Sequence, residues 1–374
     1  MENRLNKIEK ILLMGPGPSS VHPDVYSALS RPTLGHMDSY FISIMDDIKF
    51  LLQQIFKTKN PLTIPISGTG SAGMETCFVN LVEPGDNVLV LVNGVFGTRM
   101  CDVATRLGAL VDSLEFDWGT PVLVGKVSDQ LKKKTYKVLA MVHAETSTGV
   151  KNPAAEIGML LQNGGPFYLL DVVTSLGGID VAVDEWGVDA AYSGSQKCLS
   201  CPPGLSPVTF SERATRYIKK RNRAVPNWYL DMGMILKYWD GKQRVYHHTA
   251  PINMLYALYQ SLLLFSNEGS DNVFKRHLEC HQHLVKSLNN LGISMFVEEP
   301  NRLPMLNAVR IPENVNDSIA RELLRNRYKI EIGNGLGPLA GRIWRIGLMG
   351  YTAQKENVDA LIDALTPVIE KSGK

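Results

Sequence analysis

A single lysine stands among small and polar residues, next to two cysteines at CxxC spacing. Residues 192–204 read YSGSQKCLSCPPG, with Lys197 followed by Cys198 and Cys201. A thioredoxin-type CxxC pair sits near the start of a small domain, and a zinc site needs a second pair of ligands, so neither context is met. We therefore interpret the cysteines as small packing residues. Lys197 is the candidate reactive group, because a lysine in a confined, partly apolar site can lose its proton and attack an aldehyde.

Two further charged residues stand at apolar segments that have the pattern of strands. Asp171 ends the run PFYLLD, and Arg345 lies inside RIWRIGLMG. Strands of open α/β sheets deliver functional side chains at their carboxyl ends, and a buried carboxylate needs a cation or a strong donor. An arginine in a buried strand needs an anion, and a substrate carboxylate suits its planar fork. Viewed alone, a turn role for Asp171 and a structural ion pair for Arg345 are equally good interpretations.

A glycine-rich segment, GTGSAG at 68–73, follows a predicted strand and opens a predicted helix. It satisfies GxGxxG, but a dinucleotide site also needs an acidic residue about 20 positions later, at the end of the next strand. That strand, 87–92, runs instead into Asn93 and Gly94. The glycines still let backbone N–H groups approach a phosphate at a helix N-terminus, so we predict a site for a mononucleotide-sized phosphate.

These four features together describe one kind of site. A phosphate loop, an aspartate for a pyridinium nitrogen, a Schiff-base lysine and a carboxylate-binding arginine are the parts of a pyridoxal phosphate site. We expect no metal. The cluster HLECHQH at 277–283 places His277, Cys280, His281 and His283 close in sequence, but no second ligand cluster lies nearby, and a solvated helix face is the better interpretation.

The elements that must position these residues alternate along the first 250 residues. The segment 39–56 has helical spacing of its apolar residues, whereas 61–66, 87–92, 136–142, 166–173 and 205–210 are short apolar runs typical of buried strands. Helical patterns separate several of them, so the sequence predicts an α/β fold with a mostly parallel sheet covered by helices.

After residue 250 the pattern changes. Two long helical segments, 252–269 and 272–292, precede shorter predicted strands at 293–298, 305–311 and 342–350. This is typical of a smaller α+β C-terminal domain. The boundary falls in the first long helix, and we divide the chain into a large domain at 21–260 and a small domain at 261–374.

Composition excludes several classes of function. The 374 residues carry a net charge of +2 with interspersed signs, which gives no nucleic-acid footprint. No apolar run approaches the ~20 residues that span a bilayer, and the first residues resemble neither a secretory signal nor a transit peptide. Five cysteines is a low and odd number, which favours a reduced compartment. We expect a cytoplasmic protein without a membrane partner.

The sequence resembles the class V aminotransferases of fold type I, and within them the alanine–glyoxylate/serine–pyruvate aminotransferase group. The resemblance covers nearly the whole chain in the right order. It runs through LLMGPGPSSVHP, NPLTIPISGTGSAGMET, LVEPGDNVLVLVNGVFGTRM, HAETSTGV, LLDVVTSLGGIDVAVDEWGVDAAYSGSQKCLSCPPG, YHHTAPINMLYAL and IEIGNGLGPLAGRIWRIGLMG. It implies a large domain with a seven-stranded sheet, a small C-terminal domain, and an N-terminal arm, residues 1–20, that contributes to a homodimer.

The resemblance also assigns roles around the phosphate and the reacting groups. Lys197 matches the Schiff-base lysine, and Asp171 and Arg345 match the partner of the ring nitrogen and the carboxylate clamp. Further phosphate-binding positions are matched by Thr69, Gly70, Ser71 and Gln196. Ser71 stands where some relatives have histidine.

Five other positions match residues around the cofactor ring and the dimer. Phe96 occupies the ring-stacking position, where relatives often have tryptophan. Thr146 lies beside the ring hydroxyl, and Val173 packs under the ring. Tyr246 and Thr249 match positions that reach the phosphate of the neighbouring subunit's cofactor, which implies a dimer with two shared sites.

The implied activity is pyridoxal-phosphate-dependent transamination from a small amino acid, alanine or serine, to glyoxylate. The products are glycine and a 2-oxo acid, by ping-pong kinetics through a Lys197 Schiff base. A ureidoglycine–glyoxylate or 2-aminoethylphosphonate-type aminotransferase is the alternative in the same cofactor class. A cysteine desulfurase-like lyase shares the fold and ranks lower, because it needs a mobile-loop cysteine and usually a histidine on the ring, where Phe96 stands here.

Overall fold

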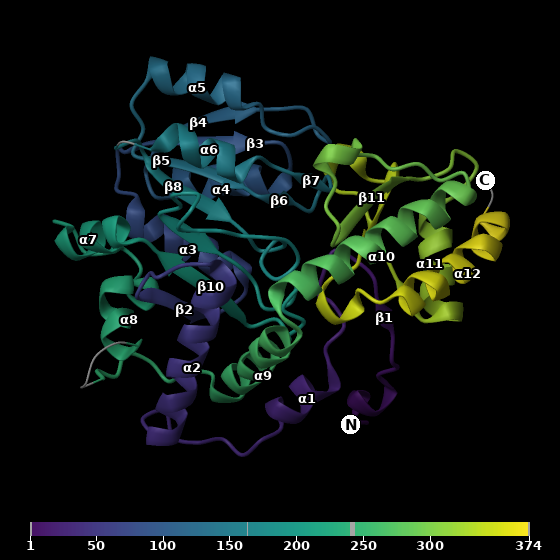
Figure 1. Ribbon diagram of the computed structural model, residues 1–374, viewed down its shortest axis with the longest axis horizontal. Coiled ribbons are helices and arrows are strands. Elements are labelled where there is room, and N and C mark those ends of the chain that lie inside the picture. The colour runs from purple at the N-terminus through teal and green to yellow at the C-terminus, as the bar shows by residue number, and fades with distance from the viewer. Residues whose placement is uncertain (1, 163, 240–243, 373–374) are drawn as a thin grey trace.

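The centre of the fold is a seven-stranded β-sheet covered by helices (Figure 1). The computed structural model describes residues 2–162, 164–239 and 244–372. In spatial order the strands are β2 (Leu62–Ser67), β10 (Leu205–Phe210), β9 (Ala190–Tyr192), β8 (Phe167–Asp171), β5 (Val138–Val142), β3 (Asn87–Val92) and β4 (Leu110–Glu115). Only β10 runs antiparallel to its neighbours. The predicted seven-stranded, mostly parallel sheet is therefore confirmed.

Helices that alternate with these strands complete the large region. They are α1 (Pro23–Leu29), α2 (Ser39–Phe56), α3 (Gly70–Leu81), α4 (Val95–Arg106), α5 (Val124–Lys133), α6 (Ala154–Leu161), α7 (Glu212–Lys220) and α8 (Met232–Trp239). The β5 strand is buried along its whole length, as a parallel strand with both faces covered must be. The α2 helix has the bounds that its apolar spacing predicts, and Asp38 caps it by accepting from the N–H groups of Tyr40 and Phe41.

The C-terminal region packs around a second apolar core (green to yellow in Figure 1). Two long helices, α9 (Ile252–Glu268) and α10 (Ser270–Asn290), lead into it. It also holds β11 (Leu306–Arg310), α11 (Asp317–Tyr328), β12 (Ile330–Glu331), β13 (Gly333–Asn334), β14 (Ile343–Gly347) and α12 (Lys355–Lys371). Strands β11, β14 and β13 form an antiparallel sheet, and Trp344 of β14 is fully buried in its core.

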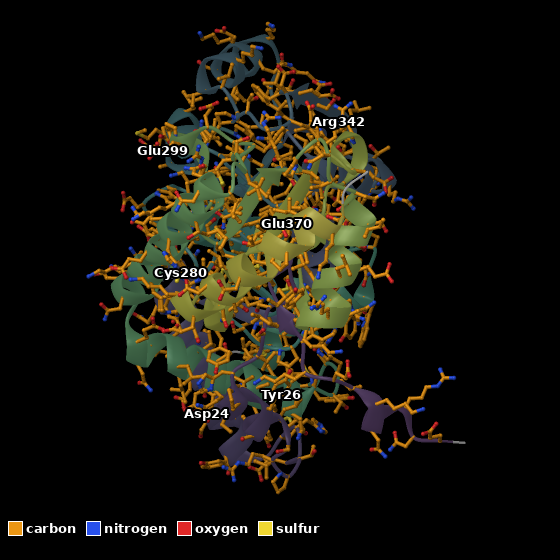
Figure 2. The ribbon with its side chains drawn as sticks, turned by 90° about the vertical axis from the view of Figure 1, so that its right-hand side faces the viewer. Asp24, Tyr26, Cys280, Glu299, Arg342 and Glu370 are labelled. Carbon is orange, nitrogen blue, oxygen red and sulfur yellow. The ribbon has the colours of Figure 1, made fainter. Side chains whose placement is uncertain are left out.

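The N-terminal segment connects the two regions. Strand β1 (Leu12–Leu13) pairs in parallel with β12, and Met14 belongs to the second core. A few residues later, Ser19 bonds to the backbone of the lysine loop through Oγ and the Lys197 carbonyl at 2.8 Å. The preceding turn, Arg4–Lys7, extends away from the body of the chain, with Leu5 70% exposed (Figure 2).

One predicted strand, 293–298, is wrong. The structure holds only a single bridge there, between Met295 and Val309. The chain then turns into a short 3-10 helix, Glu299–Asn301. The Phe296 N–H still bonds the Ala308 carbonyl at 2.9 Å, and the turn at Glu299 ends the pairing with β11.

The prediction of a solvated face for the histidine cluster is also wrong. His277 is fully buried, and Cys280 and His281 are 2% and 8% exposed. His277 accepts a hydrogen bond from the Gly350 N–H at 2.9 Å and bonds the Val273 carbonyl at 2.7 Å. Burial lowers the pKa of His277 to about 4, so it is a neutral structural group.

The rest of the cluster is also used within the fold. His281 bonds the Asn307 side chain at 2.6 Å, and the more exposed His283 contacts Asp359 at 2.6 Å. Among the described residues, no group of three or more potential ligands could hold a metal ion. Within the same ranges, no helix has both the length and the apolar character needed to cross a membrane.

Candidate active site

The predicted residues converge at the carboxyl ends of the parallel strands, around a pocket of about 200 Å³. Nine of them line it: Thr69, Gly70, Ser71, Phe96, Thr146, Asp171, Val173, Gln196 and Lys197. They come from five separate stretches of the chain, brought together because parallel strands end at one edge of a sheet.

The start of α3 supplies one wall of the pocket. Strand β2 ends at Ser67, and Gly68 (φ +143°) turns the chain into the helix in a conformation that side chains rarely adopt. Thr69 is the N-cap but makes no side-chain capping bond. The first N–H groups of α3 are therefore not capped by a side chain, and Gly70 approaches Val173 so closely that a Cβ would lie 3.2 Å from its Cγ2. This is the arrangement that a phosphate needs.

Asp171 ends β8 and is almost completely buried. Its Oδ1 accepts from the Val173 N–H at 2.8 Å, and its Oδ2 accepts from the Tyr192 hydroxyl at 2.6 Å. Burial raises the pKa of Asp171 to about 7, while the Tyr192 and Val173 bonds oppose that rise. Glu145 raises the same pKa and Lys197 lowers it.

Lys197 lies in the loop after β9 and is covered by the N-terminal segment. Its Nζ donates to the Pro16 carbonyl. Gly17 lies so close that a Cβ there would be 2.6 Å from the Lys197 Nζ. Desolvation, followed by the charge of Arg345, lowers the pKa of Lys197 to about 8. A lysine with this pKa is partly neutral near pH 7, which its nucleophilic role requires.

Arg345 comes from the C-terminal region and is not among the residues that line the pocket, but it contacts Thr146, which is. It is 5% exposed and is held by carbonyl groups, with Nε donating to Asn334 at 2.6 Å and Nη1 to Thr146 at 3.2 Å. Burial lowers its pKa to about 10, so it stays charged at pH 7, and the carboxylate of Glu145 favours the charge. No salt bridge to Arg345 occurs within the described residues.

Glu145 is a buried carboxylate that the sequence analysis missed. It accepts from the Ser147 hydroxyl at 2.6 Å and from the N–H groups of Phe96 and Gly97 at 3.2 and 3.4 Å. These two N–H groups belong to the first turn of α4, so Glu145 caps that helix from a distant segment. The contact fixes the backbone of Phe96 at the mouth of the pocket.

Tyr192 and Arg99 were missed as well. Tyr192 reads as one more apolar strand residue, and only its cross-strand contact with Asp171 reveals a polar role. Arg99 lines the pocket with its guanidinium 5.0 Å from the centre of the Phe96 ring. The i,i+3 spacing of Phe96 and Arg99 on a predicted helix is the signal that could have identified this pair.

Tyr246 and Thr249 do not line the pocket of their own chain. They lie together on the surface, with their hydroxyl oxygens 3.2 Å apart, and Tyr246 is 54% exposed. Their predicted role toward a neighbouring subunit stays a prediction.

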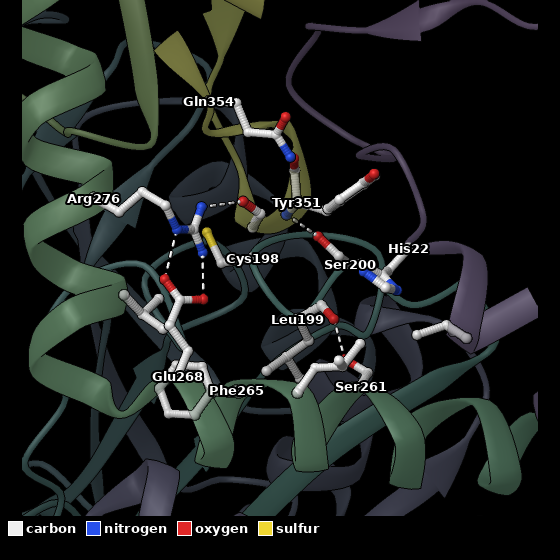
Figure 3. Close-up of a pocket in the computed structure, with 14 residues that line it drawn as sticks. His22, Cys198, Leu199, Ser200, Ser261, Phe265, Glu268, Arg276, Tyr351 and Gln354 are labelled. Carbon is white, nitrogen blue, oxygen red and sulfur yellow. Dashed lines mark hydrogen bonds and ion pairs between the residues drawn. The ribbon is translucent and has the colours of Figure 1, made fainter. Parts of the chain in front are cut away.

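The two cysteines beside Lys197 are buried, and both are free thiols. Desolvation raises the pKa of Cys198 and of Cys201 to about 12, which keeps them protonated and unreactive. Cys198 lines a separate cavity of about 420 Å³, and Figure 3 shows it beside the Arg276–Glu268 ion pair. The cysteines therefore pack behind the site, as the sequence analysis predicted.

Comparisons with known proteins show which family this chain belongs to. Residues 20–361 match the family model "Aminotransferase class-V". The chain belongs to this family. It is therefore a pyridoxal-phosphate-dependent aminotransferase. This class V aminotransferase is 40% identical to the alanine–glyoxylate aminotransferase of Rattus norvegicus, and the match covers 98% of this chain and 89% of the relative.

Two solved structures extend the match to three dimensions. The alanine–glyoxylate aminotransferase from Nostoc sp. superposes with a TM-score of 0.94 at 46% identity, covering 98% of this chain and 99% of that one. The ureidoglycine–glyoxylate aminotransferase from Bacillus subtilis gives a TM-score of 0.96 at 38% identity, covering 98% and 94%. The fold type I architecture is thus shown.

The pocket fits pyridoxal phosphate. Oε1 of Gln196 is buried and has no hydrogen-bond partner within the described chain, which leaves this amide for a ligand. It lies near the uncapped start of α3, the end suited to the phosphate. Phe96 and Val173 provide apolar surfaces for a ring, and Asp171 and Lys197 provide a carboxylate and an amine. These residue types match the phosphate, ring, nitrogen and aldehyde of the cofactor.

Proposed function

We propose that this aminotransferase transfers the amino group of a small amino acid, alanine or serine, to glyoxylate, which gives glycine and a 2-oxo acid. The observation that carries the proposal is a contact beside one small pocket: the Arg345 guanidinium donates to the carbonyl of Thr146, which lines the same pocket as Lys197. A donor whose carboxylate meets Arg345 brings its α-carbon toward Lys197. The similarity to alanine–glyoxylate aminotransferases supports the choice of donor and acceptor.

Lys197 has two tasks in this proposal. Its Nζ, partly neutral because its pKa is about 8, would hold the cofactor. As a free amine, Nζ would also be the general base that takes the proton from the donor's α-carbon. The Pro16 carbonyl, which binds Nζ here, is an acceptor within reach of the free amine.

Arg345 holds the donor and the acceptor in turn. Nε and one N–H of Nη1 are engaged by the Asn334 and Thr146 carbonyls, so the guanidinium is fixed while its remaining N–H groups stay available. These groups can bind a carboxylate in a bidentate fork. Alanine, serine and glyoxylate all carry that carboxylate.

Asp171 governs the proton on the cofactor's ring nitrogen. Pyridoxal phosphate, when bound, supplies an electron-accepting ring that stabilises negative charge at the donor's α-carbon. The ring accepts electrons best while its nitrogen is protonated. A carboxylate fixed by two hydrogen bonds at the end of β8 favours that protonated state.

A matrix of donors against acceptors tests the proposal. Purified protein is assayed with alanine, serine, ureidoglycine and 2-aminoethylphosphonate as donors and with glyoxylate, pyruvate and 2-oxoglutarate as acceptors. We expect alanine or serine with glyoxylate to give the highest kcat/KM, with the parallel double-reciprocal lines of ping-pong kinetics. A higher kcat/KM with another donor would replace the proposed one.

Ureidoglycine is the second candidate donor. The Bacillus subtilis structure named as a ureidoglycine–glyoxylate aminotransferase superposes with a TM-score of 0.96, slightly above the alanine–glyoxylate enzyme from Nostoc sp.. The same matrix decides between the two donors. A desulfurase activity is disfavoured because Cys198 and Cys280 are both buried with raised pKa values.

We also propose that residues 1–20 form an arm, that 21–260 and 261–374 are the large and small domains, and that two chains share their sites. Exposed aromatic residues support a dimer: Trp228 is 56% exposed and stacks on His247, close to the exposed Tyr246. Such a patch is typical of an interface.

A hybrid dimer tests the sharing of sites. Lys197→Ala and Tyr246→Ala chains are mixed, dissociated and reassociated. If Tyr246 serves the neighbouring site, each hybrid contains one site with both residues intact, and activity returns. If Tyr246 serves its own site, no hybrid site is complete and the mixture stays inactive.

For localisation, we propose the cytoplasm. The supporting observation is that all five cysteines are free thiols, which suits a reducing compartment. Fractionation of cells that express the protein at its natural level, with antibody detection, tests this.

A further inference from the structure

The Tyr192 hydroxyl is buried against a carboxylate of the active site. Tyr192 is fully buried, and its hydroxyl donates to Asp171 Oδ2 at 2.6 Å, the only hydrogen bond it makes within the described residues. A buried phenol hydroxyl needs a hydrogen-bond partner. This one is bound to Asp171, the one carboxylate among the described residues that line the pocket.

Strand register creates the pair. β8 and β9 run in parallel with Asp171 directly opposite Tyr192, and Leu170 opposite Ala191. Residues opposite each other point to the same face, so a slip of one residue would carry Tyr192 to the other side of the sheet. Helix α3 packs against the base of this side chain, because Gly73 approaches so closely that a Cβ there would lie 3.0 Å from the Tyr192 Cβ.

We propose that Tyr192 is a positioning residue that keeps Asp171 ionised and oriented, so that the proton shared with the cofactor stays on the ring nitrogen. The inference rests on the proposed role of Asp171. It adds a residue that never touches the cofactor's nitrogen but decides on which atom the proton sits.

Hydrogen-bond capacity explains how this works. Each carboxylate oxygen has two acceptor positions. The Val173 N–H uses one on Oδ1 and the Tyr192 hydroxyl uses one on Oδ2, which leaves acceptor capacity toward the pocket. Both donors stabilise the carboxylate and reduce its affinity for a proton. In a buried pair that shares one proton, the weaker base at Asp171 leaves that proton on nitrogen.

The other ionisable groups around the pair do not replace Tyr192. Burial raises the pKa of Asp171 to about 7, and the Tyr192 bond is the largest effect opposing that rise, ahead of Val173 and of Lys197. Glu145 acts in the opposite direction and raises the pKa. Cys77 of α3 is buried, and its pKa lies well above the ordinary value, so it is a neutral thiol.

The matched control is Tyr168, on the neighbouring part of the same sheet. It is also fully buried, and its hydroxyl donates to the Ala154 carbonyl at 3.1 Å, away from the pocket lining. Tyr168→Phe therefore removes a buried phenol hydroxyl without touching the carboxylate. Any effect common to both variants reports stability alone.

The test is nitrogen NMR of the holoenzyme loaded with pyridoxal phosphate labelled at its ring nitrogen. We expect a protonated nitrogen in the unmodified protein and in Tyr168→Phe, and a shift toward the unprotonated signal in Tyr192→Phe. Loss of a hydrogen bond to a charged group should also lower kcat about tenfold. An unchanged nitrogen signal in a folded Tyr192→Phe protein overturns the proposal.

Two further measurements keep the test decisive. Site-specific replacement of Tyr192 by 3-fluorotyrosine keeps the ring and strengthens its donor, so the nitrogen signal should stay protonated, and loss of that signal would overturn the proposal even if Tyr192→Phe folds poorly. With a cofactor analogue that has carbon in place of the ring nitrogen, Tyr192→Phe should cost no further activity. An equal loss with that analogue would overturn the proposal. If neither alanine nor serine reacted with glyoxylate in the donor matrix, the proposed substrates would be wrong. The proposal for Tyr192 would still be tested separately, because the nitrogen NMR signal does not depend on the substrate.

Discussion

The seven-stranded sheet and the three-stranded sheet each position one charged side chain of the candidate site, Asp171 and Arg345. The two side chains are held in place differently. Asp171, at the end of β8, has a hydrogen-bond donor on each oxygen: the Val173 N–H, two residues further along the chain, and the Tyr192 hydroxyl, on the neighbouring strand β9. Arg345, in β14, is held by one carbonyl from its own region, Asn334, and one from the large region, Thr146. The cofactor side is thus prepared inside one core, whereas the carboxylate side depends on how the two regions meet.

This difference bears on specificity. A group fixed inside one core keeps its geometry whatever the substrate, because packed interiors resist small displacements. A group held by contacts from two regions changes its position when the two regions shift relative to each other. We therefore expect changes near Asp171 and Lys197 to affect every donor equally, and changes near Arg345 to separate donors from one another.

The largest effect is expected from Lys197→Ala. The variant loses both the group that anchors the cofactor and the base, so kcat should fall about 10⁴-fold or more with every donor. The measurement is the donor matrix, together with the visible absorbance of the bound cofactor. Wild-type turnover with any donor would contradict the role of Lys197.

The second effect is expected from Arg345→Gln. Loss of a buried charge-assisted pair costs about 3 kcal/mol, so kcat/KM for alanine should fall about 100-fold. Alaninamide, which has no carboxylate, serves as the control donor. The two proteins should use it equally well, and an equal loss with the amide would show that Arg345 only stabilises the fold.

A smaller effect is expected in the pH dependence of cofactor loading. The pKa of Lys197 is lowered from 10.5 to about 8 and only the neutral amine reacts, so loading should speed up about tenfold per pH unit below 8 and level off above it. Stopped-flow absorbance of the cofactor-free protein measures this.

Arg345→Gln should move the same profile to higher pH, because removal of the neighbouring positive charge lets the lysine pKa rise. The shift of this pH profile therefore measures the electrostatic coupling between Arg345 and Lys197. A profile that does not move would mean that the two side chains are not coupled.

The smallest effect is expected from the two cysteines. Cys198→Ser and Cys201→Ser should keep kcat/KM within about twofold, because both thiols are buried and stay protonated. Thermal unfolding of each variant provides the control for packing. A large loss of activity without loss of stability would make one of these thiols a functional group.

Local patterns were sufficient for much of the fold. The apolar spacing of 39–56 and of 252–269 predicted two helices that the structure has, and the continuous apolar runs predicted the buried strands. The segment 293–298 failed because a β pattern says nothing about whether a partner strand continues, and the chain turns at Glu299 instead.

The histidine cluster failed for a related reason. Spacing places His277 and His281 on one helix face, but whether that face meets water or another element depends on packing. In the structure the face meets Gly350 and Asn307, which satisfy both rings. A polar residue that finds buried partners looks the same in sequence as one that is solvated.

The sequence by itself determined the chemistry at hand: a lysine among small residues, an aspartate ending an apolar strand, an arginine within another and a glycine loop at a helix start. Each of these groups can be recognised from its residue type and from the residues next to it in the sequence. Only the tertiary structure decided which groups act on one another. Tyr192 meets Asp171 through the register of β8 and β9, and Glu145 reaches the start of α4 across 48 positions of the chain. Such contacts depend on long-range packing, which short-range patterns do not encode.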